Sequence, residues 1–174
     1  MNTHQNGAKL KWRERWALWQ LNILGHLTVF VLWLLRLGTL GQISPPVATV
    51  AVVERDGHVL ALRRPDGRYT LPGGIMRYGE TCKEALAREV REETGAEVEI
   101  LDLIGIYSDP KQANAHYHSV KLAYHCQWLG GEPHSSYEGT PCWLPWNALP
   151  EPDAWANLSL KVLTDLHDGN QHIC

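Results

Sequence analysis

The chain has 174 residues, of which 44% are hydrophobic and 20% are charged, with a formal net charge of −3. This length suits one compact domain and excludes two full domains with a linker, and the slightly acidic balance argues against a general nucleic-acid binder. The four cysteines include no Cys-x-x-Cys pair, so we expect reduced thiols rather than a disulfide framework or a zinc finger.

Residues 1–46 differ from the rest of the chain in charge. They carry five basic side chains against Glu14 alone, a net charge of +4, whereas the remaining residues carry 11 basic and 18 acidic side chains, a net charge of −7. Residues 16–35 form an uncharged run, and a helix of that length would reach about 30 Å, which is roughly the thickness of a bilayer core. We therefore expect a basic and hydrophobic N-terminal helix, followed by a linker that ends at Pro46.

Three interpretations of this helix stay open: a secretory signal peptide, a membrane span, and a helix that lies on a membrane or packs on the domain. No small-residue cleavage site follows Leu35, which disfavours the first. A span with its basic end inside would export the rest of the chain. The polar positions scatter around the helical wheel, which disfavours an amphipathic surface helix. We favour membrane contact through residues 16–35 and leave its topology open.

A mixed α/β pattern follows the linker. A β-branched run and the pair Asp56–Gly57 predict a hairpin. Further extended segments flank a helical pattern, and the apolar spacing of Ala154, Leu158, Val162 and Leu166 predicts a second helix. The predicted strands are 47–53, 58–62, 69–71, 98–107 and 116–128, with a loop at 108–115 and the second helix at 153–167.

The first helix should begin at Thr81 and stop at Gly95. Thr81 with Glu84 three residues later is a capping box, and glycine is the usual residue after a helix end. Glu89, Glu92 and Glu93 have i, i+3, i+4 spacing and therefore share one face of this helix, where like charges repel one another. Hard divalent cations would relieve that repulsion, because they prefer carboxylate oxygens.

Residues 74–96 fit the pattern G-x5-E-x7-R-E-U-x-E-E-x-G-U, where U is an apolar residue. The pattern resembles the signature of the Nudix hydrolases at every fixed position, and a weaker resemblance extends from about Val47 to Leu166. It implies a Nudix-type α/β/α sandwich with a mixed sheet over residues 47–170. It also implies a cytoplasmic enzyme that hydrolyses a phosphorus-containing acid anhydride with Mg²⁺ or Mn²⁺.

The resemblance also implies roles for particular residues. Arg88 would orient Glu89, and Glu80 and Gly74 would support the site. The general base would be Glu138, with Glu132 as a competitor. The metal ligands would be the carbonyl of Gly73 and the side chains of Glu89, Glu92 and Glu93.

The substrate is indicated by residues outside the signature. The segment from Tyr107 to Pro110, followed by His116, is similar to the corresponding segment of ADP-ribose and nucleotide-sugar pyrophosphatases. We therefore expect a small nucleotide substrate, with phosphates bound by Arg63 and Arg64 and a base stacked on Tyr107 or Trp143. The alternatives are a house-cleaning nucleoside triphosphate pyrophosphohydrolase and a catalytically silent nucleotide-binding module. The oligomeric state stays open.

Overall fold

The computed structural model describes residues 46–108, 119–156 and 158–173. These belong to one compact unit, Pro45–Cys174. The predicted N-terminal helix lies outside the described residues and stays a prediction. Within the described ranges, no helix is long and apolar enough to cross a membrane.

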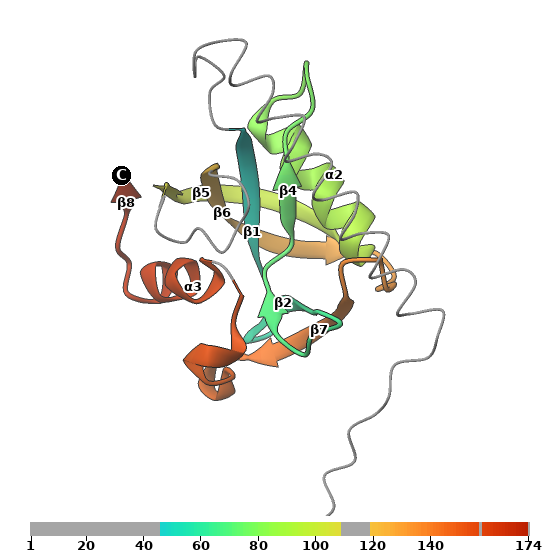
Figure 1. The fold of residues 1–174 in the computed structure, drawn as a ribbon, viewed down its shortest axis with the longest axis vertical. Coiled ribbons are helices and arrows are strands. Elements are labelled where there is room, and N and C mark those ends of the chain that lie inside the picture. Colours follow the sequence, from blue (N-terminus) through green and yellow to red (C-terminus); the bar gives the residue numbers. More distant parts are fainter. Residues whose placement is uncertain (1–45, 109–118, 157, 174) are drawn as a thin grey trace, which may run out of the picture. The chain divides into compact units, whose positions relative to one another are not determined.

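The described residues form one mixed sheet with few helices (Figure 1). Most neighbouring strands are antiparallel, but β1 runs parallel to β6 and β5 runs parallel to β8. The path through the sheet is β3-β2-β1-β6-β5-β8, with β4 paired to β1 and β7 paired to β2. The strands are β1 (Val47–Arg55), β2 (His58–Arg63), β3 (Tyr69–Thr70), β4 (Gly73–Ile75), β5 (Glu97–Tyr107), β6 (Val120–Gly130), β7 (Thr140–Pro145) and β8 (His172–Ile173).

Two helices cover opposite faces of the sheet. Successive side chains of β1 point to opposite faces, so the residues that each helix contacts show which face it covers. Ala51 and Val53 pack in the cluster that includes Leu86 of α2 (Cys82–Thr94). Val52 packs in the cluster that includes Val162 of α3 (Ser159–His167). Figure 1 shows α2 and α3 on either side of β1. The observed arrangement is therefore a sheet between two helices, as expected.

The ends of α2 confirm the sequence prediction. Thr81 is the N-cap, and its hydroxyl accepts a hydrogen bond from the Glu84 backbone N–H at 3.3 Å, while the Thr81 backbone N–H donates to the Glu84 carboxylate at 2.8 Å. Gly95 ends the helix at a φ of 75°, a left-handed conformation that favours glycine. The capping box therefore sets where each glutamate of α2 stands along the helix.

The second predicted helix is shorter than expected. It begins at Ser159, and Pro152–Ala154 instead form one 3-10 turn. The intervening backbone pairs with β3, because the Ala156 N–H donates to the Tyr69 carbonyl at 2.7 Å. A backbone group committed to a neighbouring strand cannot also continue a helix. The apolar spacing correctly identified the buried face but not this competing contact.

Candidate active site

Arg88, in the middle of α2, is the centre of a charged network that reaches Glu80 just before the helix. Its Nε and Nη2 donate to the two carboxylate oxygens of Glu80 at 2.6 and 2.9 Å, and its Nη1 donates to Glu89 Oε1 at 2.7 Å. The hydrogen bonds from Arg88, and then the one from the Arg77 backbone N–H, lower the pKa of Glu80 to about 2. Glu80 therefore stays ionised and fixes the guanidinium that in turn holds Glu89.

Glu93 is a buried carboxyl in an unusual environment. It is 3% exposed, its Oε2 accepts a hydrogen bond from the Gly73 N–H at 2.9 Å, and its buried Oε1 accepts none from the described residues. Burial raises its pKa, and the neighbouring carboxyl of Glu138 and then the charge of Glu89 raise it further. A carboxyl pressed against two others in a buried position is stable as an anion only beside a positive charge.

The two glycines of β4 are required by close approach. A Cβ on Gly73, whose φ is 152°, would lie 2.1 Å from the Thr49 carbonyl oxygen. A Cβ on Gly74 would lie 2.5 Å from the carboxyl carbon of Glu89. The first contact is with rigid backbone, and the second is with the end of a side chain. Gly73 is therefore needed for the strand pairing, and Gly74 leaves the space in which the Glu89 carboxylate lies.

Glu92 is exposed, unlike Glu93. Its two oxygens accept hydrogen bonds from Arg77 Nη2 at 3.3 and 3.1 Å, and Oε2 also accepts from Arg88 Nη1 at 3.3 Å. In the part of the chain that the structure describes, no three Asp, Glu, His or Cys side chains meet at metal-ligand spacing. The three glutamates of one helix face therefore have different partners: Arg88 for Glu89, two arginines for Glu92, and β4 for Glu93.

Glu138 is brought to Glu93 by a short loop before β7. The Ser136 N–H donates to the Gly139 carbonyl at 3.0 Å, and the Glu138 N–H donates to the Ser136 hydroxyl at 3.3 Å. Register adds a second constraint, because Thr140 pairs with Arg63 of β2. Forty-five residues of chain separate Glu93 from Glu138, and only the sheet brings them together.

The predicted phosphate-binding arginines lie beside this loop. A Cβ on Gly139 would be 2.6 Å from the Arg63 carbonyl oxygen and 3.4 Å from the Arg64 Cα, so the loop packs directly on this pair. The Nε of Arg64 is buried and has no hydrogen-bond partner among the described residues. Arg63 is exposed. Two cationic side chains without an ion-pair partner in the described chain therefore flank the loop that carries Glu138.

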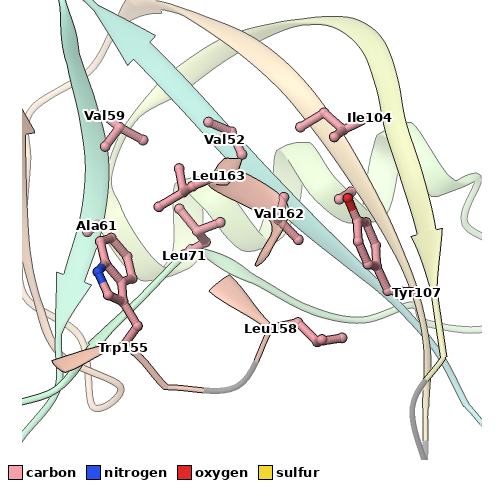
Figure 2. Packing of buried hydrophobic residues seen from close by; sticks show 11 residues of the cluster. Val52, Val59, Ala61, Leu71, Ile104, Tyr107, Trp155, Leu158, Val162 and Leu163 are labelled. Carbon is pink, nitrogen blue, oxygen red and sulfur yellow. The ribbon is translucent and has the colours of Figure 1, made fainter. Parts of the chain in front are cut away.

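Tyr107 lies in the core and not on the surface. It is 1% exposed, its hydroxyl donates to Asp165 Oδ2 at 2.9 Å, and its ring stacks on His172 at 4.9 Å between centroids. Figure 2 shows it among the buried side chains of the α3 cluster. This placement contradicts the stacking role expected for Tyr107, because neither face of the ring is open to a base. The alternating pattern of its strand makes Tyr107 point inwards.

Trp143, the other aromatic side chain expected to stack, packs against the α2 cluster and lies edge-on to Trp128, with Arg55 over Trp128. The expected substrate-specificity positions Pro110 and His116 lie outside the described residues. Glu132, the competing base, is exposed, and its backbone lies against Gly95 at the end of α2.

Sequence reasoning missed two residues of this region. Arg77 lies inside the signature, but nothing in its position indicates that it pairs with Glu92. Tyr137 is exposed beside Glu138, and its pKa is raised to about 12 by partial burial and then by the charges of Glu138, Glu93 and Glu89. A tyrosine directly before the expected base was the only available signal.

The donors of this site fit a hard divalent cation. The buried Glu93 Oε1 accepts no hydrogen bond from the described residues, and the carboxyls of Glu138 and Glu89 are close enough to raise the pKa of Glu93. Oxygen ligands of this kind suit Mg²⁺ and Mn²⁺ rather than softer metals. Beside these acidic residues, the unpaired arginines and an exposed tyrosine add groups that suit an anionic, aromatic ligand.

Comparisons with known proteins identify the family. The NUDIX domain model matches residues 44–166. A "MutT-like protein" of Streptomyces ambofaciens is 35% identical over 136 residues, which cover 75% of this chain and 84% of that protein. An "ADP-ribose pyrophosphatase" of Methanocaldococcus jannaschii is 34% identical over 94 residues, which cover 52% of this chain and only 55% of that protein.

A solved structure shares the fold. The "MutT NUDIX hydrolase from Burkholderia pseudomallei" superposes with a TM-score of 0.62 at 27% identity, covering 71% of this chain and 99% of that one. Residues 44–166, which the family model matches, contain α2, the loop that carries Glu138, and α3 except for its last residue. The family model, the relatives and the fold all lead to the same conclusion: this chain belongs to the Nudix hydrolase family.

Proposed function

We propose that this enzyme hydrolyses the pyrophosphate linkage of a nucleoside diphosphate joined to another moiety, of the ADP-ribose or nucleotide-sugar type, with Mg²⁺ or Mn²⁺ as cofactor. The observation that carries the proposal is the buried carboxyl of Glu93, whose pKa is raised by burial and by the neighbouring Glu138 and Glu89, and whose Oε1 accepts no hydrogen bond from the described residues. The name of the Methanocaldococcus jannaschii relative supports the substrate class.

Glu89, Glu92 and Glu93 would hold the cation, together with a backbone oxygen of Gly73. When bound, a divalent ion neutralises the charge of the phosphates and makes a bound water more acidic. Arg88 keeps the Glu89 carboxylate in place, and Gly74 keeps the space around it clear. Glu80 holds Arg88. These residues prepare an oxygen-rich site before the substrate arrives.

Glu138 would act as the general base. In the proposed reaction the oxygen of a water molecule forms a bond to one phosphorus atom while the bond from that phosphorus to the bridging oxygen breaks. The carboxylate of Glu138 accepts the proton that the water loses, and the leaving phosphate retains the bridging oxygen. A positioned base of this kind typically contributes about 10²–10⁴-fold to the rate.

Arg63 and Arg64, which lie next to the loop that carries Glu138, would bind the phosphates. The buried Nε of Arg64 supports this role for Arg64, because a buried guanidinium nitrogen without a partner is costly unless a ligand supplies an acceptor. Tyr137 is the exposed aromatic side chain nearest the expected base and could contact the nucleoside. Tyr107 takes no part, because it is buried.

The test is a substrate panel assayed with the full chain. ADP-ribose, a nucleotide sugar, a dinucleotide and a nucleoside triphosphate are incubated with Mg²⁺ or Mn²⁺, and the products are separated by chromatography. We expect a nucleoside monophosphate and a phosphorylated second half from ADP-ribose or the nucleotide sugar. Preferred release of inorganic pyrophosphate from the triphosphate would instead favour a MutT-like activity, and no turnover of any compound would favour a silent binding module.

Two glutamate variants identify the base. Glu138→Gln should lower kcat by at least about 100-fold, because the amide cannot accept the proton. Glu132→Gln is the matched control. It removes the same charge from a nearby position of the same loop but leaves Glu138 intact. Full turnover in Glu138→Gln, or the larger loss in Glu132→Gln, would overturn the assignment.

A further inference from the structure

Arg77 makes an ion pair that nothing in the signature requires. Its Nη2 lies 3.1 Å from Glu92 Oε2 and 3.3 Å from Oε1, so a single nitrogen bridges both oxygens of the carboxylate. Arg77 belongs to the turn between β4 and α2, and Glu92 belongs to the third turn of α2. The pair therefore joins the turn before α2 to the third turn of that helix.

The turn that carries Arg77 is itself anchored. The Arg77 N–H donates to Glu80 Oε2 at 2.8 Å, and the Glu80 N–H donates to the Arg77 carbonyl at 3.2 Å. Glu80 also binds Arg88, so one carboxylate organises both arginines that reach Glu92. The backbone of Arg77 is thereby held in place, while its side chain extends towards Glu92.

The two arginines differ in how easily they can leave Glu92. The Arg88 side chain is 15% exposed and is held by three short contacts with Glu80 and Glu89. The Arg77 side chain is 61% exposed, and its only ion pair in the described chain is the one with Glu92. Exposed pairs of this kind are weak and are readily exchanged for another partner. Arg77 is therefore the replaceable partner.

We propose that Arg77 is a built-in competitor of the divalent cation for the Glu92 carboxylate, and that it thereby sets the metal affinity of the site. The inference rests on the proposed function, because it assumes that Glu92 becomes a ligand. In the metal-free protein the guanidinium neutralises Glu92, whose oxygens both face arginines. A cation that takes an oxygen of Glu92 must first displace Arg77, which swings into solvent. The metal affinity is lowered by the free energy of the ion pair that is lost.

The test measures Mn²⁺ binding to the full chain without nucleotide, using the electron paramagnetic resonance signal of the free ion. Arg77→Gln should bind Mn²⁺ roughly two- to fivefold more tightly than the unaltered protein, which is the range expected for the loss of an exposed ion pair. Arg77→Lys should lie between the two, because it keeps the charge but loses the planar guanidinium group. A gain in affinity cannot arise from a variant that merely disturbs the fold.

Two controls separate the contact from general charge. Arg91→Gln removes an equal charge from an exposed position on α2 with no ion pair to Glu92, so it should change Mn²⁺ affinity less than Arg77→Gln. In a Glu92→Gln background, Arg77→Gln should have no further effect, because the carboxylate for which it competes is absent. Equal gains in Arg77→Gln and Arg91→Gln, or an undiminished gain without Glu92, would overturn the proposal.

Failure of this inference is distinguishable from failure of the proposed function. If the unaltered chain does not bind Mn²⁺, or if Glu93→Gln leaves that binding unchanged, the metal site itself is wrong. If that binding is present and the Arg77 variants match their controls, only the role of Arg77 is refuted.

Discussion

Replacement of Glu93 by glutamine should stabilise the metal-free protein while it removes the metal site. Glutamine keeps the shape of the side chain and an oxygen that can accept the Gly73 N–H. Its amide group can also donate to Glu138, which the carboxylate of Glu93 repels. The substitution therefore removes a buried carboxyl that has no counter-ion among the described residues and that must bind a proton when the metal-free protein folds.

The size of the effect follows from the raised pKa of Glu93, which is shifted from 4.5 to about 9 by burial and by Glu138. Because the folded-state pKa is above the unfolded one, the native protein binds this proton more tightly, and its contribution to stability is present below about pH 4.5 and lost as the pH rises towards 9. Between about pH 5 and about pH 8 the loss at Glu93 is on the order of 4 kcal/mol. For a domain of this size that corresponds to roughly 10 °C in Tm.

The assay is thermal unfolding followed by circular dichroism in EDTA at about pH 5 and about pH 8. Glu93→Gln should melt above the unaltered protein near pH 8, where folding requires Glu93 to take up a proton. The difference should shrink near pH 5, where the unfolded chain already binds part of that proton. Glu99→Gln, at an exposed position of β5, removes the same charge and should leave Tm nearly unchanged. At saturating Mn²⁺ the order should reverse, because only the unaltered protein gains stability from the bound ion.

A Glu93→Gln protein that melts below the unaltered one near pH 8 in EDTA would show that the Glu93 carboxylate is not repelled by its neighbours. An equal gain in Tm from Mn²⁺ in both proteins would show that Glu93 is not a ligand. Either result refutes the reasoning from burial and charge.

Three further predictions concern the supporting residues. Because the pKa of Glu80 is lowered to about 2, its stabilising contribution is present above about pH 4.5 and lost as the pH falls towards 2. In Glu80→Gln the free energy of unfolding should therefore fall less steeply over this pH range, as measured by urea unfolding at a series of pH values. Gly74→Ala should fold, but in a binding titration its affinity for Mn²⁺ should be lower by a factor of about ten or more, because its Cβ meets the Glu89 carboxyl. Gly73→Ala should give little folded protein, because its Cβ meets the backbone of Thr49. Tyr107→Phe should lower stability by about 1–2 kcal/mol in denaturant unfolding, through loss of the hydrogen bond to Asp165, and leave KM unchanged; a raised KM would restore a substrate role.

Local spacing along the sequence determined the helix that carries the chemistry. The capping box at Thr81 and the glycine at position 95 predict both ends of α2, because the groups that satisfy a helix terminus lie within a few residues of it. The same spacing predicts that Glu89, Glu92 and Glu93 share a face. The most specific part of the family resemblance lies in this segment.

The tertiary structure decided which of those glutamates is buried and what each one contacts. Glu138 reaches Glu93, Arg77 reaches Glu92, and Tyr107 turns into the core through the pairing of strands and the packing of helices on both faces of the sheet. Proline-containing β7 was missed as a strand because its pairing with β2 stabilises it despite weak local preference. Contacts between residues far apart in the chain depend on register and on which face of the sheet is covered. A single sequence records neither, because these are properties of the packed whole and not of any short window of residues.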